Sequence, residues 1–177
     1  MIQRLQQAAA ITCAVSMFFA FAPSMYAANI AVAPPQIQAA LFVKLLSFHN
    51  GINGGGDISV HVIGAPDFAA EMTKIIGVKI GQSTLTAINE GEDSDSLTEK
   101  PSAIYIGDAS KLDDVIRYTR ANKVLSMTGI PELVSAGITL GIGVSGGKPR
   151  VLLNISSSKD EDIDWNHAIL KVSTTFE

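Results

Sequence analysis

Hydrophobic residues along the chain follow two spacings, one typical of strands and the other typical of helices. Short apolar runs bounded by turn residues predict strands over residues 58–63, 83–88, 103–106, 124–127, 138–144 and 150–155. Apolar residues at helical spacing predict helices over residues 36–48, 66–76, 131–137 and 162–174, and a further helix that begins at a capping box of Ser110 and Asp113. This alternation predicts an α/β sandwich with a mostly parallel central sheet, an antiparallel edge hairpin and helices on both faces.

The first predicted helix carries more hydrophobic residues than one buried face needs. Ile37, Leu41 and Leu45 form a normal stripe, but apolar side chains also stand beside it. Such a helix is either buried on most sides or partly covered by another chain. Three of its residues are therefore candidate partner contacts, with ordinary core packing as the alternative: Phe42, Leu46 and Phe48.

The start of the last predicted helix holds the only tryptophan of the chain. Trp165, Ile169 and Val172 share a helical stripe that would normally face the core, whereas Ile163 points elsewhere. We therefore expect Trp165 to be largely buried and Ile163 to be the more exposed of the two. Ile163 is the fourth candidate partner contact.

The N-terminal segment has the pattern of an export signal. Arg4 is the only charged residue before Lys44, and it precedes an apolar run over residues 8–22. That run is shorter than the roughly 20 residues of a membrane-spanning helix. We expect residues 1–28 to be a signal peptide, 29–35 a linker and 36–177 a single domain in the periplasm. The alternative is an uncleaved anchor.

Composition excludes several classes of protein. The 177 residues, 47% of them hydrophobic, suit one packed domain rather than a disordered chain. Thirteen Lys and Arg against 17 Asp and Glu give a net charge of -4, and no basic run suggests nucleic-acid binding. The single cysteine, Cys13, excludes an internal disulfide and would leave with the signal peptide.

Two motifs resemble binding sites for a cofactor or a metal. Residues 141–146 match the GxGxxG dinucleotide fingerprint, but a strand follows them where the fingerprint requires a helix. Asp160, Asp162 and Asp164 alternate as in a calcium loop. However, Trp165 and Lys171 occupy the places of its glycine and glutamate. We assign the glycines to a hairpin and the aspartates to helix capping, so no cofactor or metal is expected.

The sequence also offers no recognisable catalytic constellation. His49, His61 and His167 lie in different predicted elements, and they are expected to be structural or surface residues. The chain has no Gly-x-Ser-x-Gly elbow, HExxH motif or P-loop. We therefore expect a protein that is not an enzyme.

Several segments, taken in order, resemble the YfiR-like family of bacterial periplasmic proteins. The resemblance rests on the helix over residues 39–48, on Ile63-Gly64-Ala65-Pro66-Asp67-Phe68, on the strands at 104–107 and 124–127, on the hairpin over 137–155, and on apolar positions between 163 and 172. It spans nearly all of residues 36–172. The chain departs from the family at Gly51-Ile52, where a Trp-Pro is usual, and lacks the cysteines that many members pair.

The resemblance implies a periplasmic protein that represses an inner-membrane diguanylate cyclase by binding the periplasmic domain of the cyclase. Several members also dimerise, so the resemblance is compatible with a homodimer and leaves the oligomeric state open. We therefore expect a regulatory binding protein whose partner is the periplasmic domain of an inner-membrane signalling protein. The alternative is a periplasmic small-ligand binding protein that serves an outer-membrane uptake system. A ligand binder should have one pocket with convergent polar groups, whereas a regulator should have an exposed apolar surface.

Overall fold

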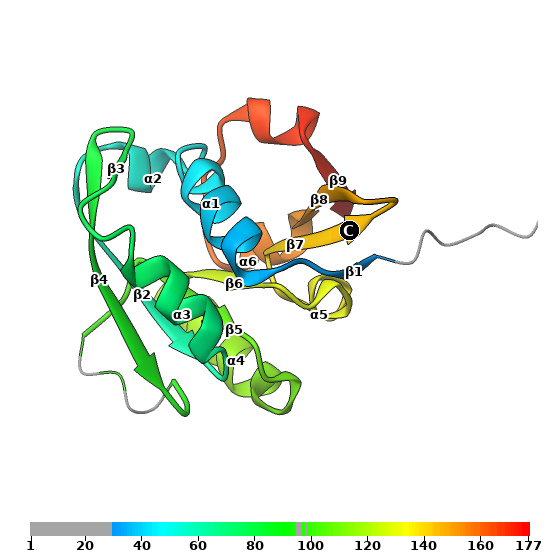
Figure 1. Ribbon diagram of the computed structural model, residues 1–177, viewed down its shortest axis with the longest axis horizontal. Helices are drawn as coiled ribbons and strands as arrows, with labels where there is room; N and C mark the ends of the chain where they lie inside the picture. The colour runs from blue at the N-terminus through cyan, green and yellow to red at the C-terminus, as the bar shows by residue number, and fades with distance from the viewer. Residues whose placement is uncertain (1–29, 95–96, 98) are drawn as a thin grey trace, which may run out of the picture.

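The computed structural model describes residues 30–94, 97 and 99–177, and its strands form one mixed sheet (Figure 1). The strands of the described chain are β1 Ala31–Val32, β2 Gly56–Ile63, β3 Lys79–Ile80, β4 Ser83–Gly91, β5 Ala103–Ile106, β6 Leu125–Thr128, β7 Leu140–Ser145, β8 Lys148–Asn154 and β9 Ser173–Phe176. They lie in the order β3-β4-β2-β5-β6-β7-β8-β9, and β1 pairs with β7.

Helices cover both faces of this sheet. The α-helices are α1 Pro35–Leu46, α2 Asn50–Asn53, α3 Pro66–Thr73, α4 Leu112–Asn122, α5 Pro131–Ser135 and α6 Ile155–Asp160, and two 3-10 helices are η1 Ala109–Lys111 and η2 His167–Lys171. Side chains of α1 and α3 pack with Val60 and Val62 in the larger core, while α4 and α5 pack with Ile63 in the smaller one. Since neighbouring strand residues point to opposite faces, β2 contributes to both cores.

The predicted α/β architecture is confirmed. Strands β4, β2, β5, β6 and β7 run parallel, and β3–β4 and β7–β8 are antiparallel pairs. The β7–β8 hairpin turns at Gly146 and Gly147, whose φ angles of 59° and 72° suit glycine. Strand β9 pairs in parallel with β8, so the sheet continues for one strand beyond the hairpin.

Two local predictions are wrong. Residues 162–174 do not form a helix: α6 ends at Asp160, and the chain continues through η2 into β9. The capping box is also wrong, because no side chain caps α4. Instead, the carboxylate of Asp108 caps the preceding η1 by accepting the backbone N–H of Ser110 at 2.9 Å. In both places tertiary pairing or a nearer side chain satisfies the backbone groups that the predicted pattern would have used.

Part of the segment predicted as a linker pairs with the sheet. Residues 31–32, within the predicted linker, form β1 and pair with Val144 and Gly143 of β7. A Cβ atom on Gly143 would lie 2.2 Å from Ile30 Cγ2, so this close approach requires glycine. The predicted signal peptide lies outside the described residues. Within those residues, no helix is long and apolar enough to cross a membrane.

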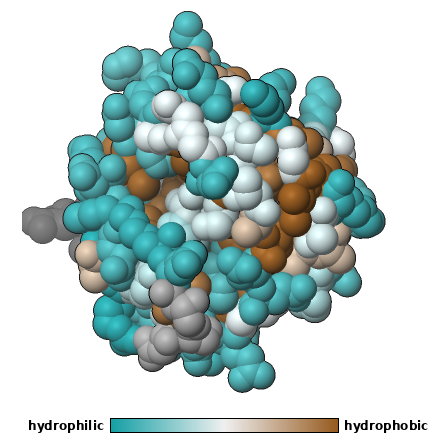
Figure 2. Space-filling view, turned by 90° about the vertical axis from the view of Figure 1, so that its left-hand side faces the viewer, coloured by the Kyte–Doolittle hydropathy of each residue, from teal (hydrophilic) through white to brown (hydrophobic). Residues whose placement is uncertain are grey.

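Some large hydrophobic side chains remain on the surface. Among the described residues the most exposed are Val32, Ile37, Ile76, Val78, Leu170 and Val172. Figure 2 looks at the edge of the sheet formed by β3 and β4, where hydrophobic residues lie among hydrophilic ones. Single exposed apolar residues are normal on a protein surface. A group of them can mark an interaction site.

Candidate functional site

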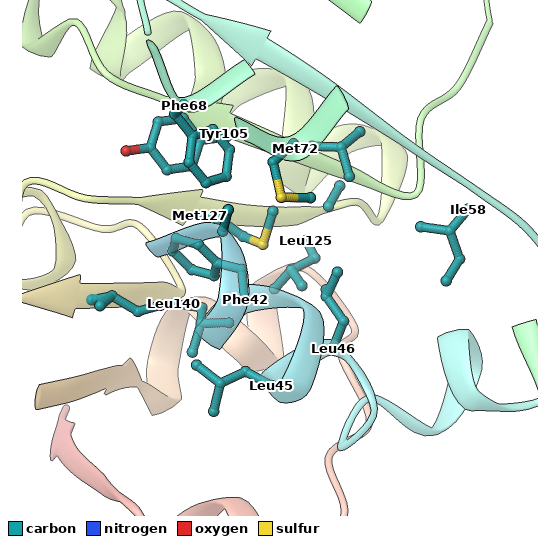
Figure 3. Close-up of a cluster of buried hydrophobic side chains, with 14 of the residues drawn as sticks. Phe42, Leu45, Leu46, Ile58, Phe68, Met72, Tyr105, Leu125, Met127 and Leu140 are labelled. Atoms are coloured by element: carbon teal, nitrogen blue, oxygen red, sulfur yellow. The ribbon is translucent and has the colours of Figure 1, made fainter. Parts of the chain in front are cut away.

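Two of the four candidate partner contacts lie in the core. Phe42 and Leu46 have an exposed fraction of 0%. The ring of Phe42 meets the rings of Phe68 and Tyr105 edge-on, with both centroid distances at 5.8 Å, and Figure 3 shows all three converging. For Phe42 and Leu46, the structure therefore supports the core-packing alternative, because the sheet and α3 cover the wide apolar face of α1.

The other two candidates are half-buried and come from segments that the structure joins. Phe48 and Ile163 both pack against the larger core. The backbone N–H of Asn166 donates to the carbonyl of Phe48 at 2.7 Å, and that of Asn50 donates to the carbonyl of Asp164 at 2.9 Å. We call the partly exposed surface of these two segments, 48–50 and 163–166, the bridge patch.

Trp165 stands in the centre of the bridge patch. It forms an isolated β-bridge with His49, and the two ring centroids are 5.6 Å apart. Its indole N–H donates to the hydroxyl of Ser158 at 3.0 Å. Trp165 and Ile163 are both partly buried and both pack against the larger core, so the expectation that Ile163 is the more exposed of the two stays a prediction. The face assignment assumed a helix, whereas this segment pairs in extended form with the end of the first helix.

A separate crevice lies at the carboxyl ends of β4, β2 and β5. In the chain, β2 is followed by β4 on one side and then by β5 on the other, so the crevice lies at a topological switch point. Open α/β sheets commonly bind ligands at such a point. The crevice has a volume of about 540 Å³, and its charged lining residues are Glu90, Glu92, Asp108 and Lys111.

The floor of this crevice depends on one glycine. Gly64 follows β2 with a φ of +67°, and a Cβ there would lie 2.6 Å from Asp108 Cβ. Glycine thus allows the loops after β2 and β5 to touch. Pro66, in the first turn of α3, also lines the crevice.

A smaller cavity of about 230 Å³ lies between the start of α1 and the ends of β5 and β6. The hydroxyl of Tyr105 donates to Gln38 Oε1 at 2.5 Å, and Gln38 Nε2 donates to the carbonyl of Ala33 at 2.6 Å. Burial raises the pKa of Tyr105 above its ordinary value, so the hydroxyl stays protonated and able to donate. Sequence analysis missed this pair, because Gln38 looked like an ordinary polar position of a helix.

The histidines and aspartates weighed as site residues do not form one site, although His49 and Asp164 both lie in the bridge patch. Burial lowers the pKa of His61, whose Nε2 lies 3.3 Å from the carbonyl of Asp93. Asp160 pairs with Arg120 at 3.2 Å, and Asp164 accepts from the side chain of Asn50 at 2.9 Å. Within the described part of the chain, no three metal-ligating side chains gather.

A protein-family model matches residues 35–174 and describes its members as YfiR/HmsC-like. The chain belongs to the YfiR/HmsC-like family. The match covers the domain from α1 into β9 and agrees with the resemblance found in the sequence. No curated protein matches the chain.

Two solved structures are similar in fold. One is an ABC domain from Streptococcus pneumonia in complex with L-Trp, with 14% identity, a TM-score of 0.51 and 80% of this chain covered. The other is a conserved domain protein from Vibrio cholerae, with 14% identity, a TM-score of 0.53 and 83% covered. The chain spans 61% of the length of each. At this identity the likeness supports the α/β fold alone.

Proposed function

We propose that this YfiR/HmsC-like protein is a periplasmic regulatory binding protein that controls an inner-membrane diguanylate cyclase by direct contact with its periplasmic domain. The family match over residues 35–174 carries the proposal, because the family is one of generally regulatory proteins without catalytic activity. The bridge patch supplies a surface of the right kind. It is partly apolar, it contains a tryptophan and an imidazole, and backbone hydrogen bonds join its two segments.

The test measures cyclic di-GMP formation by a membrane-embedded cyclase of the source bacterium with and without the purified protein. Addition of the protein should lower the rate, and the two proteins should co-purify from solubilised membrane. Substitution Ile163→Asp should weaken both effects while the protein still unfolds cooperatively. Ile37→Asp is the matched control, because Ile37 is exposed at the opposite end of α1 from Phe48. Unchanged cyclase activity at saturating protein would contradict the proposal.

The crevice at the switch point favours a second function, the binding of a small charged ligand. Its volume lies within the range of about 300–1,000 Å³ typical of ligand pockets. Lys111 and three carboxylates line this crevice, which suits a ligand with both an anionic and a cationic group. A screen of such compounds by thermal unfolding should find one that raises the melting temperature, and Lys111→Ala should abolish the rise. The exposed Lys148→Ala is the control.

A further inference from the structure

Strand β4 pairs with β2 along its inner edge, with one bulged residue at Thr86, but is paired along only a small part of its outer edge. On the inner side it follows β2 from Gly56↔Ser83 to Ile63↔Gly91. On the outer side β3 reaches only Ser83 and Thr84, and backbone bonds between Leu85 and residues 77–78 extend this cover by one residue. No described strand pairs with the outer edge over residues 86–91, which lies on the left of Figure 1.

This free segment has the properties of a strand acceptor. Residues 87–91 follow the bulged Thr86 in regular register. At about 3.3 Å each they give an edge of about 17 Å, which accommodates a strand of ordinary length. The segment contains no proline, and Glu90 is its single charged residue. Alternate backbone N–H and C=O groups of an edge strand point outward and lack partners in the sheet, so an added strand satisfies them.

The two ends of the segment differ in chemistry. At its start, Ile76 and Val78 are 45% and 39% exposed, and the bond from Leu85 N–H to the carbonyl of Val78 holds them beside the edge. At its end, Glu90 and Glu92 are exposed, and neither forms an ion pair with a residue that the structure describes. Figure 2 shows weakly polar residues in the middle of this face with hydrophobic residues alongside.

We propose that the outer edge of β4 binds an extended segment of a protein partner, which adds to the sheet as a further strand. The segment carries a hydrophobic residue that packs against Ile76 and Val78 and a basic residue that pairs with Glu90 and Glu92. Backbone hydrogen bonds supply the attachment, and the two ends fix the register. The proposal deepens the regulatory function above and rests on it for the existence of a protein partner.

The test uses an eight-residue peptide of alternating valine and threonine with lysine at both ends. A second peptide has glutamate in place of lysine, and a third has the lysine sequence with N-methylated alternate amides. The lysine peptide should slow hydrogen exchange of backbone amides within residues 86–91 and bind about tenfold more tightly than the glutamate peptide. The N-methylated peptide should not bind, because it cannot donate to the strand edge.

Variants of the protein locate the contact. Glu90→Lys with Glu92→Lys should reverse the preference between the two charged peptides, whereas Glu132→Lys, exposed on α5, should leave it unchanged. Substitution Val78→Asp should weaken binding of the lysine peptide, because it removes the hydrophobic contact. Absence of protection within residues 86–91, or equal binding of the N-methylated peptide, would overturn the proposal.

The cyclase assay separates this proposal from the proposed function. If the peptide binds at β4 and no cyclase responds to the protein, the proposal of strand addition at β4 is supported and the proposed regulatory function is contradicted. If the Glu90→Lys, Glu92→Lys variant controls the cyclase as well as the unaltered protein does, the regulatory function is supported, but the outer edge of β4 is not the surface that binds the cyclase.

Discussion

Glu161 is the most deeply buried carboxyl group of the described chain, with an exposed fraction of 0%. Its Oε2 accepts the backbone N–H of Ser126 at 3.0 Å and the hydroxyl of Thr139 at 2.7 Å, while Oε1 has no partner among the described residues. Burial raises the pKa of Glu161 above its ordinary value of 4.5, because loss of solvation outweighs these hydrogen bonds. The residue therefore makes stability depend on pH.

Glu161→Gln should remove that dependence. Because the folded pKa is the higher one, the stabilisation by the protonated carboxyl is complete below pH 4.5 and is lost as pH rises through the folded pKa. The free energy of unfolding of the unaltered protein should fall over this window by at most about 1.4 kcal/mol per pH unit. Urea unfolding between pH 4 and 8 measures it. Asp162 is exposed, so the control substitution Asp162→Asn should leave the slope of unfolding free energy against pH unchanged. Identical slopes for Glu161→Gln and the unaltered protein would contradict this account.

Substitution of Phe42 and of Phe48 distinguishes a residue of the core from a residue that contacts the partner. Phe42→Ala should lower the free energy of unfolding by about 3–5 kcal/mol, since it leaves a cavity beside Phe68 and Tyr105. Phe48→Ala should cost clearly less, because that side chain is half-buried, and it should weaken cyclase binding. Denaturant titration and co-purification measure the two effects. Equal destabilisation by both substitutions would show that Phe48 is also a core residue.

Helix α1 packs closely against Gly129, the residue that follows β6. A Cβ atom on Gly129 would lie 2.2 Å from Oε1 of Gln38, the same oxygen that accepts from Tyr105. Glycine directly after β6 thus leaves room for the buried side chain that links the first helix to β5. The link spans distant parts of the chain, so helical periodicity alone does not reveal it.

Gly129→Ala should destabilise the protein by about 1–3 kcal/mol, because the added methyl group overpacks a filled site. Gln38→Ala should also destabilise it by removing two buried hydrogen bonds. The double variant should cost less than the sum of the two, since the methyl group then occupies vacated space. A double-mutant cycle by urea unfolding measures the coupling. Strict additivity would mean that the two residues do not share this site.

The stability of the mature protein should not depend on redox conditions. Cys13 is the single cysteine of the chain, and it lies within the predicted signal peptide. After export and cleavage near residue 27 or 28, no thiol remains to be oxidised or reduced. N-terminal sequencing of the periplasmic protein checks the cleavage, and thermal unfolding with and without dithiothreitol should give equal midpoints. A lower midpoint with dithiothreitol, or an intact Met1 on a membrane-bound chain, would contradict the prediction.

Most strands and helices of the domain could be predicted because their signals are local. The strand over residues 103–106 matches β5 Ala103–Ile106, and proline marks the start of α3 and of α5 as predicted. Chain order then implied a parallel sheet, since helical connections join successive parallel strands. The surfaces were harder to predict. Phe42 and Phe48 look equivalent in sequence, but α3 and the sheet cover only the first completely.

The sequence by itself determined the α/β class, the order of the strands and helices from α1 to β8 in outline, and the family, because hydrophobic spacing and turn residues act over a few positions. Only the tertiary structure decided how residues 162–174 fold, which side chains share a cavity, and which edge of the sheet stays unpaired. The C-terminal segment pairs with His49 and β8 rather than forming a helix, and such pairing depends on partners more than 20 residues away. Here long-range backbone pairing overrides local propensity, because the edge of β8 satisfies the backbone groups of the last strand.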